Sequence, residues 1–273
     1  MSELSAFQAF VLGALQGLAE FLPVSSSAHL ALAPWAFGWP EPGLAFDVAL
    51  HTGSLVALFW YFRTEWVALV RAAASIVSTR RVETMEQRRA VALVVATIPG
   101  GIAGFLLEKK AETAFRSPAL TAAALIVMGA VLWIVDARAA RDRALPSLSK
   151  RDALLIGCAQ AFALIPGVSR SGATITAGRA LGFDRESAAT FSFLMCMPII
   201  AAAAVLKVPK ALAQTGAALP LAVGIVTAAV SSALAISVLL RFVQRRGLGV
   251  FAIYRFVLGA AVLALVAHRS GTW

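Results

Sequence analysis

Two stretches of the chain, QGLAEFLPVSSSAH at residues 16–29 and QAFALIPGVSRSGAT at residues 160–174, follow the same pattern 144 residues apart. Each is an apolar, helix-like run that proline or glycine interrupts, followed by a serine-rich turn and a second apolar run. Aligned without a gap, the two regions share Gly13/Gly157, Gln16/Gln160, Ala19/Ala163, Val24/Val168, Ser25/Ser169 and Ser27/Ser171. Interrupted apolar helices of this kind, present twice, predict a polar site buried inside a membrane.

The composition of the chain supports a membrane environment. Of its 273 residues 60% are hydrophobic and only 14% are charged, whereas soluble domains carry about 25% charged residues. Uncharged runs cover residues 90–107, 117–135, 187–206 and 211–240, and about 20 apolar residues suffice for a helix to cross a bilayer. The sequence therefore predicts an all-α polytopic membrane protein.

Six full transmembrane helices are expected, near 44–62, 89–107, 117–135, 187–206, 218–240 and 250–267. The remaining apolar stretches, 6–36 and 153–182, are interrupted at their centres. We interpret both as re-entrant helix hairpins that enter and leave the membrane on one side. The alternative makes each half a short crossing, but halves of about 15 residues fall short of the roughly 17 that a crossing needs.

The distribution of basic residues predicts an orientation. Loops 63–89, 136–152, 179–187 and 241–249 hold 16 of the 24 Lys and Arg residues, and the opposite side holds 6. The basic side is therefore expected to be cytoplasmic, with both termini outside. The net charge of +10 then fits cytoplasmic loops and contact with anionic membrane lipids rather than nucleic acid.

Three spans separate the two hairpins, so the second must enter from the side opposite the first. This predicts an inverted-topology repeat, with both tips near the midplane. Repeat one covers 1–137 and repeat two 150–273, within a single integral membrane domain, 1–273.

The two tips carry groups that bind anions. Each second half-helix starts with backbone N–H groups that lack intrahelical partners, at the positive end of the helix dipole. Arg170 adds a planar cation suited to phosphate oxygens, and hydroxyls come from Ser25, Ser26, Ser27, Ser169, Ser171 and Thr174. Taken singly, each serine is better explained by helix packing. The segment 166–174 as a unit favours an anion site.

Charged and titratable residues at membrane depth usually mark function, because burying a charge there costs at least about 2.5 kcal/mol. Glu20 and Arg170 are such residues, and they can also simply pair. Glu20 and His29 flank one turn, so the carboxylate is placed to orient the imidazole. His51 is interpreted as a helix-packing residue, with a role near the site as the alternative. Arg255 is expected to extend to the headgroups.

Common catalytic motifs are missing from the sequence. It contains neither a phosphate-binding G-x-x-x-x-G-K-[ST] loop nor an H-E-x-x-H metal motif. The acid phosphatases that process lipid phosphates need a His downstream of their Ser-Arg pair. Thr176 stands at that position, so the resemblance to them fails.

The first stretch, Gln16 followed by Glu20-Phe-Leu-Pro-Val-Ser-Ser-Ser-Ala-His29, resembles the first motif of the undecaprenyl-diphosphate phosphatases, the bacitracin-resistance membrane phosphatases. The segment 166–174 resembles their second motif, and the length and span count also agree. This resemblance implies a multi-pass enzyme of the bacterial inner membrane. Such an enzyme hydrolyses undecaprenyl diphosphate to undecaprenyl phosphate and inorganic phosphate, recycles the carrier lipid for peptidoglycan synthesis, and confers bacitracin resistance.

The residues and the resemblance together give a predicted active site. Ser26 is the candidate nucleophile, with His29 as general base and then acid and Glu20 orienting it; in the alternative, His29 is itself the nucleophile. The residues expected to bind the diphosphate are Arg170, Ser169, Ser171, Thr174, Gln16, Ser25 and Ser27. The resemblance also implies a divalent cation, Mg or Ca, for which Glu20 is the candidate ligand. The family often has Glu where this chain has Gln16.

Other functions stay open at this point. A lipid-phosphate flippase or an anion transporter built on the same inverted repeat would explain Arg170 equally well, but it would not need a serine cluster beside Glu20 and His29. A protein that both hydrolyses and flips the lipid is a further alternative. The expected partners are the polyprenyl diphosphate and membrane lipids, and a homodimer is an additional option.

Overall fold

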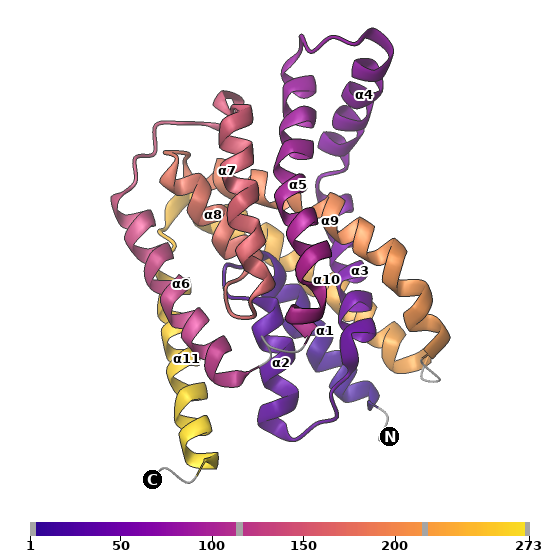
Figure 1. The fold of residues 1–273 in the computed structure, drawn as a ribbon, viewed down its shortest axis with the longest axis vertical. Helices are drawn as coiled ribbons and strands as arrows, with labels where there is room; N and C mark the ends of the chain where they lie inside the picture. The colour runs from indigo at the N-terminus through magenta and orange to yellow at the C-terminus, as the bar shows by residue number, and fades with distance from the viewer. Residues whose placement is uncertain (1–3, 113–116, 215–217, 271–273) are drawn as a thin grey trace.

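The computed structural model describes residues 4–112, 117–214 and 218–270. Figure 1 shows these residues as a bundle of helices. The first half of the chain forms α1 (Ala6–Phe21), α2 (Ser26–Phe37), α3 (Gly43–Tyr61), α4 (Arg63–Thr79), α5 (Met85–Glu112) and α6 (Pro118–Arg138). The second half forms η1 (Leu145–Ser147), α7 (Lys150–Ala161), η2 (Phe162–Leu164), α8 (Arg170–Ala180), α9 (Arg185–Gln214), α10 (Ala218–Arg245) and α11 (Gly249–Arg269).

The fold class is all-α, as predicted. Five of the described helices are long and apolar enough to cross a membrane, namely α5, α6, α9, α10 and α11. They cover the predicted spans 89–107, 117–135, 187–206, 218–240 and 250–267. A helix also forms at the predicted span 44–62, where α3 lies, although α3 is not among those five. The protein is therefore a multi-pass membrane protein.

Both predicted hairpins are interrupted where the sequence indicated. Helix α1 ends at Phe21, directly before Leu22 and Pro23, and α2 starts at Ser26. In the second hairpin α7 passes into the short turn η2, and α8 starts at Arg170 after an irregular segment, 165–169. Each hairpin thus consists of two short helices joined by a turn.

The predicted loop 63–89 is wrong over its first part, which forms helix α4. The charged residues of this segment made it resemble a loop. It nevertheless has apolar residues at every third position, Trp66, Leu69 and Ala72, which form one face of a helix. Leu69 and Ala72 are buried, and Trp66 packs against the core. Helix α4 and the start of α5 pack together and extend beyond the other helices at the upper end of Figure 1.

The two halves of the chain exchange helices. Helix α1 packs along α10 of the second half, and α7 packs along α5 of the first half. A Cβ atom added at Gly13 of α1 would overlap the backbone of Gly224, and one added at Gly157 of α7 would overlap the backbone of Ala96. Because Gly13 and Gly157 are aligned in the sequence repeat, these two close contacts are equivalent.

The last helix of each half crosses the other in a reciprocal way. Helices α6 and α11 pack together, with Gly129 of α6 against the carbonyl of Ala252 and Gly259 of α11 against the carbonyl of Ala122. Gly129 and Gly259 are separated by 130 residues, and so are Ala122 and Ala252. The crossing is therefore a contact of two equivalent segments with one another.

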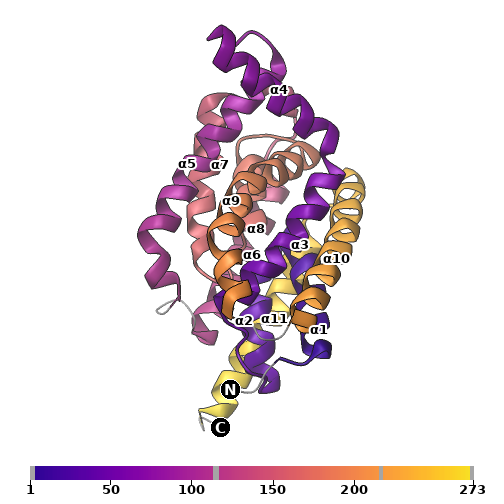
Figure 2. The ribbon, with the colours of Figure 1, turned by 90° about the vertical axis from the view of Figure 1, so that its right-hand side faces the viewer.

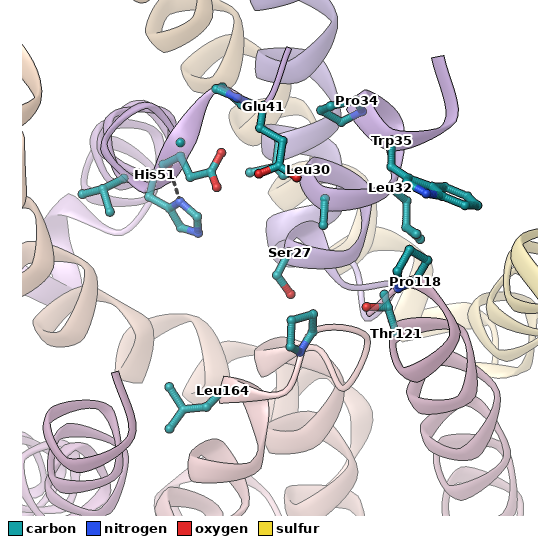
Figure 3. A pocket seen from close by; sticks show the side chains of 16 residues that line it. Ser27, Leu30, Leu32, Pro34, Trp35, Glu41, His51, Pro118, Thr121 and Leu164 are labelled. Carbon is teal, nitrogen blue, oxygen red and sulfur yellow. Dashed lines mark hydrogen bonds between the residues drawn. The ribbon is translucent and has the colours of Figure 1, made fainter. Parts of the chain in front are cut away.

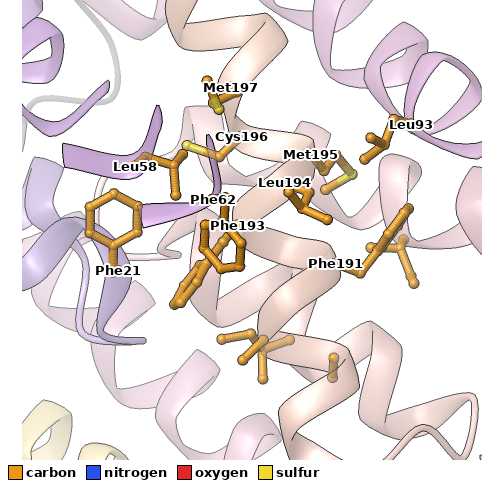
Figure 4. Close-up of a cluster of buried hydrophobic side chains, with 14 of the residues drawn as sticks. Phe21, Leu58, Phe62, Leu93, Phe191, Phe193, Leu194, Met195, Cys196 and Met197 are labelled. Atoms are coloured by element: carbon orange, nitrogen blue, oxygen red, sulfur yellow. The ribbon is translucent and has the colours of Figure 1, made fainter. Parts of the chain in front are cut away.

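The largest apolar core lies where the two hairpins meet α3, α4, α5, α9 and α10 (Figure 4). Phe21 at the end of α1 meets Phe193 of α9 edge to face, with ring centroids 5.2 Å apart. At the upper end, Asp136 of α6 accepts hydrogen bonds from Arg179 (3.0 Å), from Arg185 (2.8 Å) and from the backbone of Leu248 (2.9 Å). This cluster ties α6, α8, α9 and α11 together.

Candidate active site

The two hairpin tips have the same backbone geometry. Ser25 and Ser169, the N-caps of α2 and α8, both have positive φ angles, 75° and 71°, a conformation that side chains other than glycine rarely adopt. Ser25 Oγ accepts from the backbone of Ala28 (3.4 Å), and Ser169 Oγ from the backbone of Gly172 (3.0 Å). The caps fix both half-helix N-termini at the same sharp turn.

The tips are bonded directly to each other. The backbone N–H of Gly167 donates to Ser25 Oγ (3.2 Å), and Ser171 Oγ donates to the carbonyl of Leu22 (3.0 Å). Within each tip a serine pair also lies within hydrogen-bond distance, Ser25 with Ser27 and Ser169 with Ser171, both at 3.2 Å. Several of the serines that the sequence predicted to bind diphosphate therefore also hold the two tips together.

Arg255 of α11 lies between the tips and contacts both. Its guanidinium donates to the carbonyl of Pro23 in the first tip (3.1 Å) and to those of Gly167 (2.5 Å) and Val168 (2.8 Å) in the second. It also donates to the carbonyl of Leu125 (3.2 Å), and its side chain is fully buried. The expectation that Arg255 extends to the headgroups is wrong, because the interrupted helices leave carbonyls that need donors.

Glu20, the penultimate residue of α1, is the centre of the polar cluster. One carboxylate oxygen, Oε1, accepts from Nη2 of Arg170 (2.9 Å). The other, Oε2, accepts from Ser26 Oγ (2.6 Å) and Gln16 Nε2 (3.0 Å). Nε2 of His51 lies 3.4 Å from the same oxygen. Four of the predicted site residues, Glu20, Ser26, Arg170 and Gln16, therefore come together.

His29 lies apart from this cluster. Its Nδ1 is 2.7 Å from the carbonyl of Ser25, and its Nε2 is 2.6 Å from the hydroxyl of Tyr254, whose ring stacks on the imidazole. The structure does not bring His29 to Glu20 or Ser26. His51 takes the place next to Glu20, while its Nδ1 keeps the expected helix contact with the backbone of Asp47 (2.7 Å).

Thr174 also has protein partners. Its hydroxyl donates to the carbonyl of Arg170 (2.8 Å) and lies 2.7 Å from Ser192 Oγ of α9. Its side chain is buried, and its hydrogen bond to the carbonyl of Arg170 stabilises the first turn of α8.

A cavity of about 350 Å³ lies against the Glu20 cluster. Its polar lining consists of Glu20, Ser26, Ser27, His51, Gln160, Ser169 and Arg170. Within the described part of the chain, Nη1 of Arg170 and both amide atoms of Gln160 are buried without a hydrogen-bond partner. Buried polar groups normally have partners, so these atoms are suited to a polar ligand in the cavity.

Gln160 was not among the predicted site residues. The signal that could have found it is the sequence repeat, because Gln160 is aligned with Gln16. At 4% exposure its side chain is as buried as an apolar core residue.

A second cavity of about 420 Å³ continues from the first, and Figure 3 shows its lining. The two share Ser27, Val48, His51 and Leu164. The second cavity extends to Glu41 and Pro42 before α3 and to Pro118 at the start of α6. In Figure 1 these helix ends lie at the lower end of the molecule, as do both termini. The cavity is therefore a vestibule between the site and that end.

The site offers a poor cage for a metal ion. Among the described residues, no group of three or more His, Cys, Asp or Glu side chains is placed to hold one. Both oxygens of Glu20 already accept hydrogen bonds from Arg170, Ser26 and Gln16. These residues do not fit a protein-held cation at Glu20, and a divalent cation stays a prediction from the resemblance.

The fold and the site together define an integral membrane protein with a polar cavity at the tips of two interrupted helices. Comparison with known proteins identifies the family. The family described as bacitracin resistance protein BacA matches residues 9–261. The chain belongs to this family, as the two motifs predicted.

Similar curated proteins agree in their names. An undecaprenyl-diphosphatase of Gemmatimonas aurantiaca is 58% identical over 98% of this chain and 100% of its own length. The undecaprenyl-diphosphatases of Pelotomaculum thermopropionicum and Moorella thermoacetica are 48% and 47% identical, covering 98% and 96% of this chain and 99% and 98% of their own.

Proposed function

We propose that this protein hydrolyses undecaprenyl diphosphate to undecaprenyl phosphate and inorganic phosphate in the bacterial inner membrane. Relatives that match nearly the whole chain are named for this activity. The observation that carries the proposal is the hydrogen bond of 2.6 Å between Ser26 and Glu20, beside an arginine with one free nitrogen at a buried cavity. Ser26 as nucleophile, Glu20 as base and Arg170 as the cation that binds phosphate thus line one cavity.

The binding step uses the groups that face the cavity. Nη1 of Arg170 and the amide N–H of Gln160 bind oxygens of the terminal phosphate, where they also stabilise charge in the transition state. The N-terminal ends of α2 and α8 add positive potential at the same place. Most of the rate enhancement in phosphoryl transfer comes from such positioning and charge stabilisation.

The chemical step uses Ser26. Its Oγ attacks the terminal phosphorus while the bridging P–O bond breaks, and undecaprenyl phosphate leaves. Glu20 takes the Ser26 proton across the 2.6 Å hydrogen bond. Water then attacks the phosphoserine and the Ser26 O–P bond breaks, while Glu20 returns the proton to Ser26 Oγ. Inorganic phosphate leaves with both hydrogens of the attacking water, as the dihydrogen phosphate anion.

This mechanism gives Glu20 the role of base that the sequence suggested for His29. For His29 to act as base or nucleophile, its ring must leave Tyr254, 2.6 Å from Nε2. His51, rather than His29, is placed to contact that carboxylate, because its Nε2 lies 3.4 Å from Oε2 of Glu20.

For the membrane arrangement we propose six spans and two re-entrant hairpins in an inverted repeat, with repeat one at 1–137 and repeat two at 150–273. The exchange of α1 and α7 between the halves and the reciprocal crossing of α6 with α11 support this. The vestibule then reaches the side with fewer basic residues. The site opens to the periplasmic leaflet.

The same inverted repeat keeps lipid flipping as a second candidate activity, because two equivalent halves around a central site are typical of transporters. Proteoliposomes with labelled carrier lipid in one leaflet test it. Movement between leaflets that Ser26→Ala does not abolish would support flipping, and no movement above protein-free vesicles would remove it.

The phosphatase is tested by phosphate release from undecaprenyl diphosphate by purified protein. Substrate labelled at the terminal phosphate should leave label on Ser26 in wild type, and none in Ser26→Ala. Label on His29 would replace the proposed nucleophile with the alternative one. No phosphate release by well-folded wild type, with or without divalent metal, would contradict the proposed function.

A further inference from the structure

One wall of the site cavity is apolar. It consists of Gly100 of α5, which packs against the amide of Gln160, and of Ile199, Ile200 and Ala203 of α9. A diphosphate on Arg170 is covalently attached to a long hydrocarbon chain, which needs an apolar route out of the cavity. The vestibule is the poorer route, because Glu41, Asp47 and His51 stand among its apolar lining residues.

Two apolar grooves lie on the far side of this wall, beneath α4. One of about 370 Å³ runs between α4 and α5, and one of about 550 Å³ runs between α3 and α9. Both are lined by Trp66 and Pro198. The single hydroxyl in their lining belongs to Thr97 and donates to the carbonyl of Leu93 (2.7 Å). We call these two spaces together the α4 groove.

The cavity and the α4 groove lie on either side of the contact between α5 and α9. Gly100 lines the cavity and its neighbour Gly101 lines the groove; Ile199 lines the cavity and its neighbour Pro198 lines the groove. A Cβ atom added at Gly101 would have no atom within 4 Å. One added at Gly100 would overlap Nε2 of Gln160 and lie 3.1 Å from Cδ1 of Ile199. The flexible side chains of Gln160 and Ile199 thus stand at the boundary.

This contact differs from its counterpart in the other half of the pseudo-symmetric structure. Helix α3 packs closely along α10, with Gly53 against the backbone of Ile225. The equivalent pair in the other half, α9 and α5, meets over a shorter stretch, and α4 is inserted beside it. Helix α4 has no counterpart among the described residues between α9 and α10.

We infer that the polyprenyl tail of the substrate leaves the site between Gly101 and Pro198 and lies in the α4 groove. This inference rests on the proposed function, since it concerns the same substrate. A bilayer is as apolar as the tail, so the groove contributes little binding energy by burial. It provides a path by which a buried diphosphate keeps its tail in hydrocarbon.

The test compares a long and a short substrate in the variant Gly101→Phe. Open space at Gly101 lets the ring enter the groove without displacing protein atoms, so the variant should fold. Gly104→Phe is the matched control, because a Cβ there also has no atom within 4 Å and Gly104 lines neither groove nor cavity. Each variant is assayed with undecaprenyl diphosphate and with a ten-carbon prenyl diphosphate, whose tail is too short to fill the groove.

The expected result is a rise in KM of about ten-fold for the long substrate in Gly101→Phe. KM for the short substrate, kcat for both, and all constants of Gly104→Phe should stay within about two-fold. Equal losses on both substrates would show that the ring perturbs the site, and no loss on either would show that the tail lies elsewhere; both results overturn the inference. Failure of wild type to release phosphate from both substrates would instead contradict the proposed function.

Discussion

The first hairpin begins at a capping box made by Ser5 and Gln8, and the second begins at one made by Ser149 and Asp152, 144 residues later. The likeness continues to the tips. There the aligned serines Ser25 and Ser169 share a positive φ angle, and each forms a close pair with the serine two residues on. The positions that the two hairpins share are those that shape the backbone.

The hairpins differ at the positions that carry chemistry. Where the first has Glu20, the second has Leu164, and where the second has Arg170, the first has Ser26. The carboxylate of Glu20 bonds both Ser26 and Arg170, the aligned first residues of α2 and α8. One site therefore takes one group from each tip. The positions that are alike in the two hairpins shape the backbone, and those that differ supply the side chains of the site.

Making the second tip like the first should have the largest effect. The change Arg170→Ser puts the residue of the first tip at the aligned position and removes the anion ligand, leaving Glu20 without its cation. We expect kcat/KM to fall by about 10³–10⁵, measured as phosphate release. Arg170→Lys should recover only part of the loss, because an ammonium cannot bond Glu20 and phosphate in the same plane. Full activity of Arg170→Ser would show that the side chains that differ between the two tips do not carry the reaction.

Removing the charge of Glu20 should have the next largest effect. Glu20→Gln keeps the shape of the side chain but cannot take the Ser26 proton, so kcat should fall by about 10²–10⁴. His29→Ala provides the contrast, since His29 does not touch this cluster. If His29→Ala lowers kcat as much as Glu20→Gln does, the assignment of the base to Glu20 is wrong.

The two aligned glutamines, Gln16 and Gln160, are expected to have different roles, one in positioning Glu20 and the other in binding substrate. Gln160 lines the cavity and its amide has no hydrogen-bond partner, whereas Gln16 donates to Glu20. We expect Gln160→Leu to raise KM by about ten-fold, the loss of one hydrogen bond to a charged group, with the thermal unfolding temperature unchanged. Gln16→Leu should act mainly on kcat through Glu20. Identical kinetic profiles for the two variants would contradict this division.

Much of this molecule could be predicted from sequence, because hydropathy and the broken repeat follow from local patterns. The helical class, the interrupted hairpins and the grouping of Glu20, Ser26 and Arg170 are of this kind. Contacts that the two tips make with helices outside the repeated motifs could not be predicted. The position of Arg255 depends on carbonyls from both tips, and that of His29 on Tyr254, 225 residues away.

The smallest expected effect lies at the start of the hairpins. Gln8 of the first capping box is neutral, whereas Asp152 of the second is ionised and bonds Arg143, with 2.6 Å between Oδ2 and Nη2. Burial raises the pKa of Asp152, but the hydrogen bonds from Arg143 and Ser149 outweigh it, so the pKa lies below its usual 3.8. A lowered pKa means that the ionised form stabilises the fold. That stability is present above pH 3.8 and is lost as pH falls through the lowered value.

Asp152→Asn should therefore lower the thermal unfolding temperature at pH 7 by about 1–3 °C, and the difference from wild type should shrink as the pH falls below the pKa of Asp152. Gln8→Asn is the matched control and should show no such pH dependence, because the first capping box contains no titrating group. A constant difference between Asp152→Asn and wild type down to acidic pH would mean that the charge is not what distinguishes the two caps. The loss of stability in Asp152→Asn would then come from the altered hydrogen bonds of the capping box. The same cause would explain any loss of stability in Gln8→Asn.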